Sequence, residues 1–345
     1  DLSVKEANVR FVYGEDQISI PYLKAQMAGG LLIGEGSYDM TSGAFEGEAA
    51  GEHIDLSSLP VGISASGIVS GSGKAKGTYK GGTLSLEMAS GEMDGAGLSY
   101  ENMAAGKVSG FGSYRDGDWH GVFYGMDLSY DGMSMDTLSG EGTSHGGVMD
   151  IVYLTGTSGE GAFTVKGTYG PSLSLSGEVS SIDLSELSGL SGMDMAGRLS
   201  GRFVVSGSRE NPSGAADFTA RDGEIRGISF DRIAGHVSLG DQLATITSLR
   251  WEGPDGKHTV KGTVGLFAPH PLSLTIDTDK TRIEKLLALA GEDYPVTGWV
   301  ENTMTVTGTI EAPQVKGDFL AFDGSVMGEL FQSVSGEYTY DGNGI

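Results

Sequence analysis

Apolar and polar residues alternate with a period of two along most of this chain. In the stretch GWVENTMTVTGTIEAPQVKG, residues 298–317, one side carries Val300, Met304, Val306 and Ile310, while threonines dominate the other. Such alternation predicts a β-strand with one apolar face and one solvent-facing polar face. Asn302 falls on the apolar side, and the pattern alone gives no reason for an amide there.

The same alternation recurs in several other segments and predicts an all-β fold. We expect an elongated, curved antiparallel sheet that forms a taco-like, solenoid-like groove, with few short helices. The residues predicted to line the apolar side are Leu84, Leu86, Met88, Val122, Tyr124, Met126, Leu128, Leu199, Phe203, Val205, Leu272, Leu274, Ile276, Val300, Met304, Val306 and Ile310.

Turn signals separate the predicted strands. Asp-Gly pairs, which tight hairpins favour, occur at 131–132, 222–223, 255–256, 323–324 and 341–342. Short loops join antiparallel neighbours, so we predict that consecutive strands pair in sequence order.

One segment, TRIEKLLALAGEDYP at residues 281–295, predicts a short helix. Thr281 and Glu284 have the spacing of a capping box, and Ile283 begins an apolar face. Gly291 is expected to be the C-terminal cap, and Pro295 blocks continuation. We expect this helix to lie against the sheet.

Related segments indicate that the sheet grew by duplication. The stretch that begins MAGRLSGRFVVSG at residue 195 aligns with the stretch that begins VTGWVENTMTVTG at residue 296. Both continue through a proline turn, an aromatic strand and an Asp-Gly pair. We therefore predict one elongated groove over residues 1–345 built from approximate units 1–53, 54–181, 182–282 and 283–345.

Glycine is the compositional outlier, with 58 of 345 residues against a typical share of about 7%. Many glycines occupy apolar-side positions, such as Gly197, Gly201 and Gly207 among the large residues of their strand. Glycine inside a strand leaves space and marks a bend or the close approach of another body. We expect a strongly curved sheet with an incompletely filled interior. The alternative is a twisted sheet whose glycines only relieve curvature above a self-filled core.

The charge balance excludes one class of partner. Lys+Arg 22 against Asp+Glu 46 gives a net charge of −24, which repels nucleic acid, so we expect no nucleic-acid binding. There is no cysteine, so the chain has neither disulfides nor cysteine metal sites. It begins DLSVKEANVRF without an initiator methionine, and we expect it to be a segment of a longer protein.

The sequence offers no catalytic or metal motif. The glycine-rich run GSGKAKG at residues 71–77 lacks the hydroxyl that a phosphate-binding loop places after its lysine. The six histidines are scattered without metal-ligand spacing, and neither the calcium β-roll repeat nor the EF-hand loop is present. We predict that the protein is not an enzyme and uses no cofactor.

The repeating pattern resembles TamB and its AsmA-like relatives, which are related to bridge-like lipid-transfer proteins. The residues that carry the resemblance are Val296, Gly298, Val306, Gly308, Thr309, Pro313, Val315 and Gly317, together with the short helix that precedes the unit. The resemblance covers most of the chain and is strongest from Ile182 onward.

This resemblance implies a function in the periplasm of a diderm bacterium. Phospholipid acyl chains would slide along an apolar groove between the inner and outer membranes, which the protein would reach through segments outside this chain. The full-length protein would be anchored in the inner membrane and would support outer-membrane biogenesis, with a TamA-like outer-membrane barrel as a possible partner.

Two other hypotheses stay open at this point. The chain could be a surface adhesin or autotransporter passenger built as a β-helix, although no period of about 20–25 residues is visible. It could also be a tether or chaperone whose exposed sheet edges template unfolded outer-membrane strands.

Overall fold

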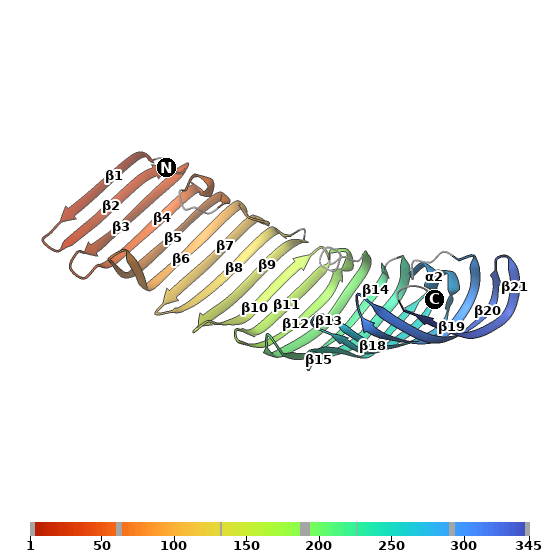
Figure 1. Ribbon diagram of the computed structural model, residues 1–345. Helices are drawn as coiled ribbons and strands as arrows, with labels where there is room; N and C mark the ends of the chain where they lie inside the picture. The colour runs from red at the N-terminus through yellow and green to blue at the C-terminus, as the bar shows by residue number, and fades with distance from the viewer. Residues whose placement is uncertain are drawn as a thin grey trace. The chain divides into compact units, whose positions relative to one another are not determined.

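The computed structural model describes residues 4–59, 64–131, 133–186, 194–225, 227–289 and 294–341. Nearly all of them are in β-strands (Figure 1). The chain divides into two compact units, Asp1–Gly170 (unit 1) and Pro171–Ile345 (unit 2). The predicted all-β fold class is confirmed.

Unit 1 is an open sheet that begins with β1 and ends with β11. Each strand pairs antiparallel with its sequence neighbours. A short 3-10 helix, η1 (Leu56–Ser58), follows β4. The strands are β1 (Val4–Tyr13), β2 (Gln17–Met27), β3 (Gly30–Asp39), β4 (Ala44–Asp55), β5 (Ala65–Lys80), β6 (Thr83–Tyr100), β7 (Met103–Arg115), β8 (Asp118–Tyr130), β9 (Met133–His145), β10 (Val148–Ser158) and β11 (Gly161–Tyr169).

Unit 2 repeats this plan from β12 to β21, again with antiparallel pairing in sequence order. Helix α2 (Ile283–Leu289) packs against β18 and β19. The strands are β12 (Ser172–Asp183), β13 (Met195–Ser208), β14 (Pro212–Ile225), β15 (Ile228–Gly240), β16 (Leu243–Gly253), β17 (Gly256–Gly265), β18 (Pro271–Arg282), β19 (Val296–Thr309), β20 (Pro313–Val326) and β21 (Glu329–Tyr340).

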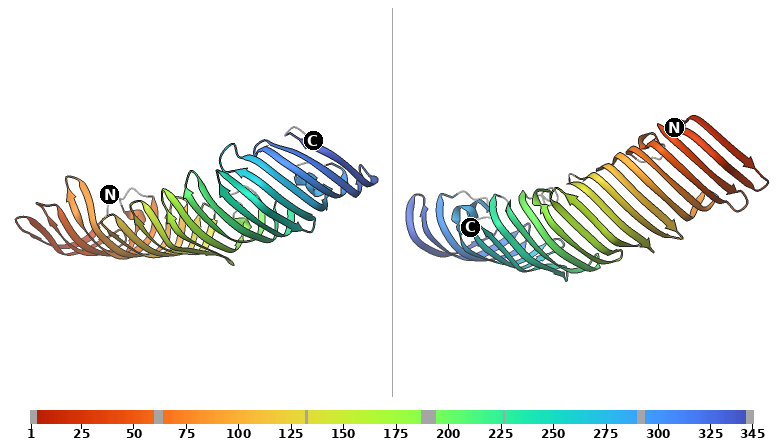
Figure 2. Two further views of the ribbon diagram at one scale, coloured as in Figure 1. Left: turned by 90° about the horizontal axis from the view of Figure 1, so that it is seen from below. Right: turned by 180° about the vertical axis from the view of Figure 1, so that it is seen from behind.

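Each unit is a single layer of strands. Figure 2 shows the strands of each unit side by side, and within the described residues each strand packs on its sheet neighbours, with no second sheet above them. The antiparallel order confirms the predicted meander. It differs from the parallel coils of a β-helix, which the adhesin hypothesis requires.

The predicted helix exists, but its predicted cap is wrong. The Thr281 hydroxyl, almost completely buried, donates to the carbonyl oxygen of Asp255. The Glu284 carboxylate accepts from the backbone N–H of Gly298 at 3.3 Å. Both side chains thus bind backbone groups of other strands and turns, whereas a capping box requires each to bind the other residue's backbone N–H. Gly291, the expected C-terminal cap, lies outside the described residues.

Two of the five Asp-Gly pairs are bulges within strands rather than hairpin turns. Asp222 in β14 and Asp323 in β20 adopt the left-handed conformation, with φ 50° and 49°. Each aspartate inserts an extra residue that shifts the alternation of faces, as a β-bulge does. Asp131 and Asp255 do lie at hairpin turns, as predicted. Gly132 and Gly342 lie outside the described residues.

The two aligned segments share backbone geometry. Gly197 and Gly298, near the starts of β13 and β19, have φ 123° and 135°, and the bulged aspartates follow in the next strands. In each segment an aromatic ring covers a glycine of the following strand: the Phe218 ring lies over Gly235, and the Phe319 ring lies over Gly336. The unit boundaries proposed from the sequence stay a prediction.

Glycines are required where neighbouring backbones approach closely. A Cβ added at Gly71 in β5 would lie 2.4 Å from the carbonyl oxygen of Glu92 in β6. Real Cβ atoms do not approach backbone oxygen so closely, so the strands would have to separate. At Gly112 in β7 the nearest atom to an added Cβ is the His120 carbonyl oxygen at 4.0 Å. Some glycines therefore permit close strand contact, whereas others leave open space.

The different space around Gly71 and Gly112 predicts different stability costs for two matched alanine substitutions on the same face. Gly71→Ala should lower the free energy of unfolding by about 1–3 kcal/mol, because the backbone must shift to admit the methyl group. Gly112→Ala should change it by no more than about 0.5 kcal/mol. Urea unfolding followed by circular dichroism measures both, and equal costs for the two variants would contradict the assignment.

Candidate apolar groove

A row of glycines crosses five neighbouring strands of unit 1. Cross-strand register places Gly73, Gly91, Gly112, Gly121 and Gly142 directly opposite one another on β5 to β9. Residues opposite each other in adjacent strands point to the same face. We call these five residues the glycine row, and the face that carries them the inner face of unit 1.

Large apolar residues alternate with glycine on one side of the row. One cross-strand line reads Gly71, Met93, Gly110, Phe123, Gly140 and Leu154, from β5 to β10. The next line reads Val69, Gly95, Val108, Gly125, Leu138, Gly156 and Phe163. A Cβ added at Gly140 would lie 2.7 Å from the Phe123 ring, so each large side chain occupies the space that its neighbour's glycine leaves.

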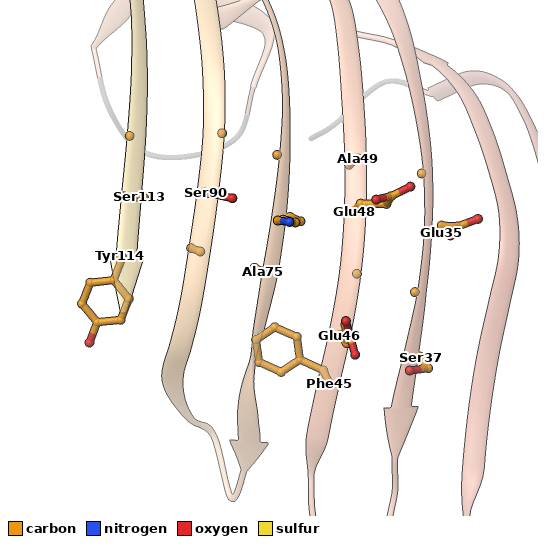
Figure 3. Close-up of a pocket in the computed structure, with 18 of the residues that line it drawn as sticks. Glu35, Ser37, Phe45, Glu46, Glu48, Ala49, Ala75, Ser90, Ser113 and Tyr114 are labelled. Carbon is orange, nitrogen blue, oxygen red and sulfur yellow. The ribbon is translucent and has the colours of Figure 1, made fainter. Parts of the chain in front are cut away.

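Aromatic residues line the other side of the row. Tyr114 and Trp119 face each other from β7 and β8, and Ala75 and Ala89 continue their line across β5 and β6. Figure 3 shows the Phe45 ring on the strand that also carries Ala49, and the Tyr114 ring on the strand that carries Ser113. The glycine row is therefore the floor of a groove, and apolar side chains form its two walls.

Two connected hollows follow this groove. One, about 940 Å³, extends from β2 to β8, and the other, about 630 Å³, extends from β6 to β10. They share Gly91, Gly112, Trp119 and Gly121 as lining residues. Side chains of the walls stay accessible: Met93, Trp119 and Phe123 expose 42%, 41% and 39% of their surface. The described residues thus leave an open apolar channel across nine strands.

The opposite face of unit 1 carries a line of polar residues from β3 to β7. Glu35, Glu48, Lys74, Ser90 and Ser113 form one cross-strand line behind the groove. This polar line faces water behind the groove, on the side of the sheet opposite the glycine row.

The structure divides the predicted residues of unit 1 between the two faces. Leu84 and Leu86 lie on the inner face near the β5–β6 hairpin, opposite Tyr79 and Gly77. Met88 lies on the outer face, opposite Lys76, because the extra residue Glu87 forms a bulge that reverses the alternation. The prediction for Met88 is wrong.

The predictions for Val122, Tyr124 and Met126 are also wrong. They share the outer face with Glu141, Ser139 and Thr137 of β9, whereas Phe123, between Val122 and Tyr124, lies on the inner face. Leu128 does lie on the inner face. Asp127 adopts the left-handed conformation, with φ 52°, which interrupts the alternation, and the Leu128 side chain lies 3.0 Å from a Cβ added at Gly125.

Unit 2 places nearly all of its predicted residues on one face. One cross-strand line runs from Phe203 in β13 to Val306 in β19 and includes Val237 and Leu274. The other predicted residues lie in neighbouring lines of the same face. Those brought together on this inner face are Leu199, Phe203, Val205, Leu272, Leu274, Ile276, Val300, Met304 and Val306. Ile310 follows the end of β19 and is 55% exposed. Whether these residues contact lipid stays a prediction.

Asn302 has a partner on this inner face. Its amide nitrogen donates to the Tyr338 hydroxyl at 2.9 Å, and that hydroxyl also lies 3.3 Å from the Asn302 carbonyl oxygen. Burial raises the pKa of Tyr338, so the phenol keeps its proton. The pair satisfies an amide that the alternation alone left unexplained.

Sequence reasoning missed the glycine row and its walls, including Met93, Trp119 and Phe123. Two signals were available. The strands of residues 65–142 contain glycines spaced by two, and Phe123 lies between glycines at 121 and 125. Spacing within one strand does not reveal which residues of the next strand lie opposite, so the row emerges only with the register.

The outer face of unit 2 is polar and partly cross-linked by ion pairs. Asp217 lies 2.7 Å from His236 Nδ1 and 3.2 Å from Arg202 Nε. The hydrogen bond from His236, followed by that from Arg202, lowers the pKa of Asp217. These groups are solvent-exposed, so we assign them a surface role.

The described residues show no metal-binding cluster of His, Cys, Asp and Glu side chains. Within the same residues, no helix has the length and hydropathy needed to span a bilayer.

Comparisons with protein-family models, with curated proteins and with solved structures gave no significant match to this chain.

His258 provides a pH test of the inner face of unit 2. Its Nδ1 lies 3.0 Å from the Thr278 hydroxyl, and its ring meets Trp251 edge-on at 6.2 Å between centroids. Burial lowers the pKa of His258 below its ordinary value of 6.5. The folded protein thus favours neutral imidazole, and this stabilisation is complete above pH 6.5 and is lost as the pH falls through the folded pKa.

We therefore expect the free energy of unfolding of the unmodified protein to fall more steeply below pH 6.5 than that of His258→Gln. Glutamine offers Thr278 a polar partner but does not titrate. Urea unfolding at a series of pH values measures the difference, and parallel pH profiles for the two proteins would refute it.

Proposed function

We propose that this chain is a bridge segment that carries phospholipid acyl chains along its apolar groove. The observation that carries the proposal is the glycine-floored channel of unit 1, which is open, apolar and flanked by accessible large side chains. The inner face of unit 2, with its lines of Leu, Val, Ile and Met, offers further lining of the same kind.

The dimensions of the glycine row suit an acyl chain. Five adjacent strands are separated by four spacings of about 4.8 Å, which gives roughly 19 Å. One leaflet of a bilayer core is about 15 Å thick, so a single extended acyl chain fits along the row. Because glycine has no side chain, nothing protrudes from the floor of the groove, and an acyl chain can lie across several strands.

The energetic argument supports transport without chemistry. Each buried methylene is worth about 0.8 kcal/mol, so a chain of roughly sixteen carbons would cost on the order of 12 kcal/mol to pass through water. A continuous apolar lane lowers that barrier. Because the groove is open along its length, a polar headgroup can stay in water while the chain slides.

The cellular setting follows from the resemblance to TamB. We place the protein in the periplasm of a diderm bacterium, between the inner and outer membranes, with a role in outer-membrane biogenesis. A TamA-like barrel is a further proposed partner. The chaperone hypothesis uses the same sheet for unfolded outer-membrane strands, and measuring bound lipid separates the two.

The direct experiment blocks the floor of the groove. Gly112→Leu places a side chain into the open space above the glycine row, while Ser113→Leu adds the same side chain to the polar face of the same strand. Native mass spectrometry of gently extracted protein should detect phospholipid on the unmodified chain and on Ser113→Leu. Gly112→Leu should retain at most about a tenth of it, equivalent to a loss of about 1.4 kcal/mol.

Circular dichroism and urea unfolding check that both variants keep the fold. Absence of phospholipid from all three proteins would contradict the proposal, as would equal occupancy in Gly112→Leu and the unmodified chain. Bound polypeptide in place of lipid would favour the chaperone hypothesis.

A further inference from the structure

The hairpin between β20 and β21 carries the most exposed apolar side chains of the described residues. Leu330 exposes 89% of its surface and Met327 exposes 81%. The hairpin between β15 and β16 of the same unit carries the polar residues Asp241 and Gln242 at its turn instead. We call Met327, Gly328 and Leu330 the β20–β21 tip (Figure 1).

Aromatic residues surround this tip. The backbone N–H of Met327 donates to the carbonyl oxygen of Pro295 at 2.9 Å, which places the tip beside Tyr294, itself 55% exposed. Trp299 and Phe322 face each other on the outer side of β19 and β20. That side is polar over most of unit 2, so these two rings form an apolar island at the same strand ends as the tip.

Two cations lie on the indole of this island. Lys280 Nζ is 4.8 Å from the centre of the Trp299 ring, and the Arg282 guanidinium carbon is 4.0 Å from it. Lys280 also lies 5.7 Å from the centre of the Phe322 ring. Neither cation has a carboxylate partner among the ion pairs of the described residues.

Three acidic groups of this region bind elsewhere. Asp255 pairs with Lys285 at 3.9 Å, Asp277 accepts from the Thr303 hydroxyl, and Glu284 accepts from a backbone N–H. Glu329 lies in the same hairpin, between Gly328 and Leu330. No ion pair of the described residues occupies the two cations, so they are available to an external anion. Glu329 and the neighbouring Asp279, Glu301 and Asp323 oppose its approach.

We propose that the β20–β21 tip and the cation–aromatic cluster behind it contact the interface of a bilayer that contains anionic phospholipid. Met327 and Leu330 enter the boundary between headgroups and acyl chains. Trp299 and Tyr294 lie at headgroup level, the position that amphipathic aromatic rings prefer. Lys280 and Arg282 meet lipid phosphates, which gives the contact its charge complementarity despite the acidic chain.

A bilayer fits this surface better than a protein partner does. A stable protein interface buries at least about 1,000 Å² with complementary shape, whereas the tip is a single hairpin turn with two protruding side chains. A membrane accepts such a protrusion without a matching pocket. The proposal does not depend on lipid transport, because the tip belongs to unit 2 and the glycine row to unit 1.

Co-sedimentation of the full chain with vesicles tests the contact. The vesicles contain phosphatidylcholine and phosphatidylglycerol in equal amounts, and the reference vesicles contain phosphatidylcholine alone. We expect the double variant Met327→Ser, Leu330→Ser to lose at least about tenfold in partitioning to the mixed vesicles. Val204→Ser, which removes an apolar side chain that is 55% exposed within β13, should bind unchanged.

The charged residues give two further readouts of opposite sign. Lys280→Gln with Arg282→Gln should remove the preference for phosphatidylglycerol, whereas Glu329→Gln should strengthen binding to the mixed vesicles. Both follow from removal of a charge beside an anionic surface.

Failure of the unmodified chain to bind mixed vesicles would overturn the proposal, as would unchanged binding of the double serine variant. If the unmodified chain self-associates but does not bind vesicles, and the double serine variant no longer self-associates, the tip would be a contact between copies of this chain. Gly112→Leu should still bind vesicles, so loss of bound lipid in the groove and loss of membrane contact are distinguishable.

Discussion

The fold depends on one constraint: each sheet is a single layer, so its inner face has to accommodate large side chains without a second layer above it. Cross-strand pairs of a large residue and a glycine meet this constraint. The Phe123 ring occupies the space above Gly140, and Phe218 does the same above Gly235. At Gly112, which faces Gly121, no side chain lies within 4 Å of an added Cβ, and a channel remains.

The glycines that the single-layer sheet requires bear on both its curvature and its groove. Close backbone approach at Gly71 is possible only without a Cβ, whereas the open space at Gly112 is not needed for packing. The glycines therefore serve both alternatives considered from the sequence: some allow the sheet to curve around self-filled rows, and others leave a groove empty. Within the glycine row itself, an added Cβ at Gly91 would lie 2.7 Å from the Ser72 carbonyl oxygen, whereas at Gly112 a small side chain would fit.

The sequence predicted the strands, their antiparallel order and the inner face of unit 2, because period-two alternation is local information. It failed where the backbone breaks the alternation: the bulge at Glu87 and the left-handed conformation of Asp127 each change the face of the next residues, and neither is visible from hydropathy. It also failed at Val122, Tyr124 and Met126, since the more apolar side of that strand is the outer one. The position of Asn302 on the inner face is explained only by its hydrogen bond to Tyr338, which lies two strands away. Register between distant residues is the information that a single sequence lacks.

Photo-crosslinking to acyl chains in the unit 2 sheet tests the central claim that the inner face carries lipid. A photoreactive residue placed at Phe203 or Val306 faces inward, and one placed at the neighbouring Arg202 or Thr305 faces outward. Crosslinks to phospholipid from the two inner positions, and not from the two outer positions, are the predicted result. Crosslinks from the outer positions alone, or none from either face in protein that has been exposed to membranes, would contradict the account.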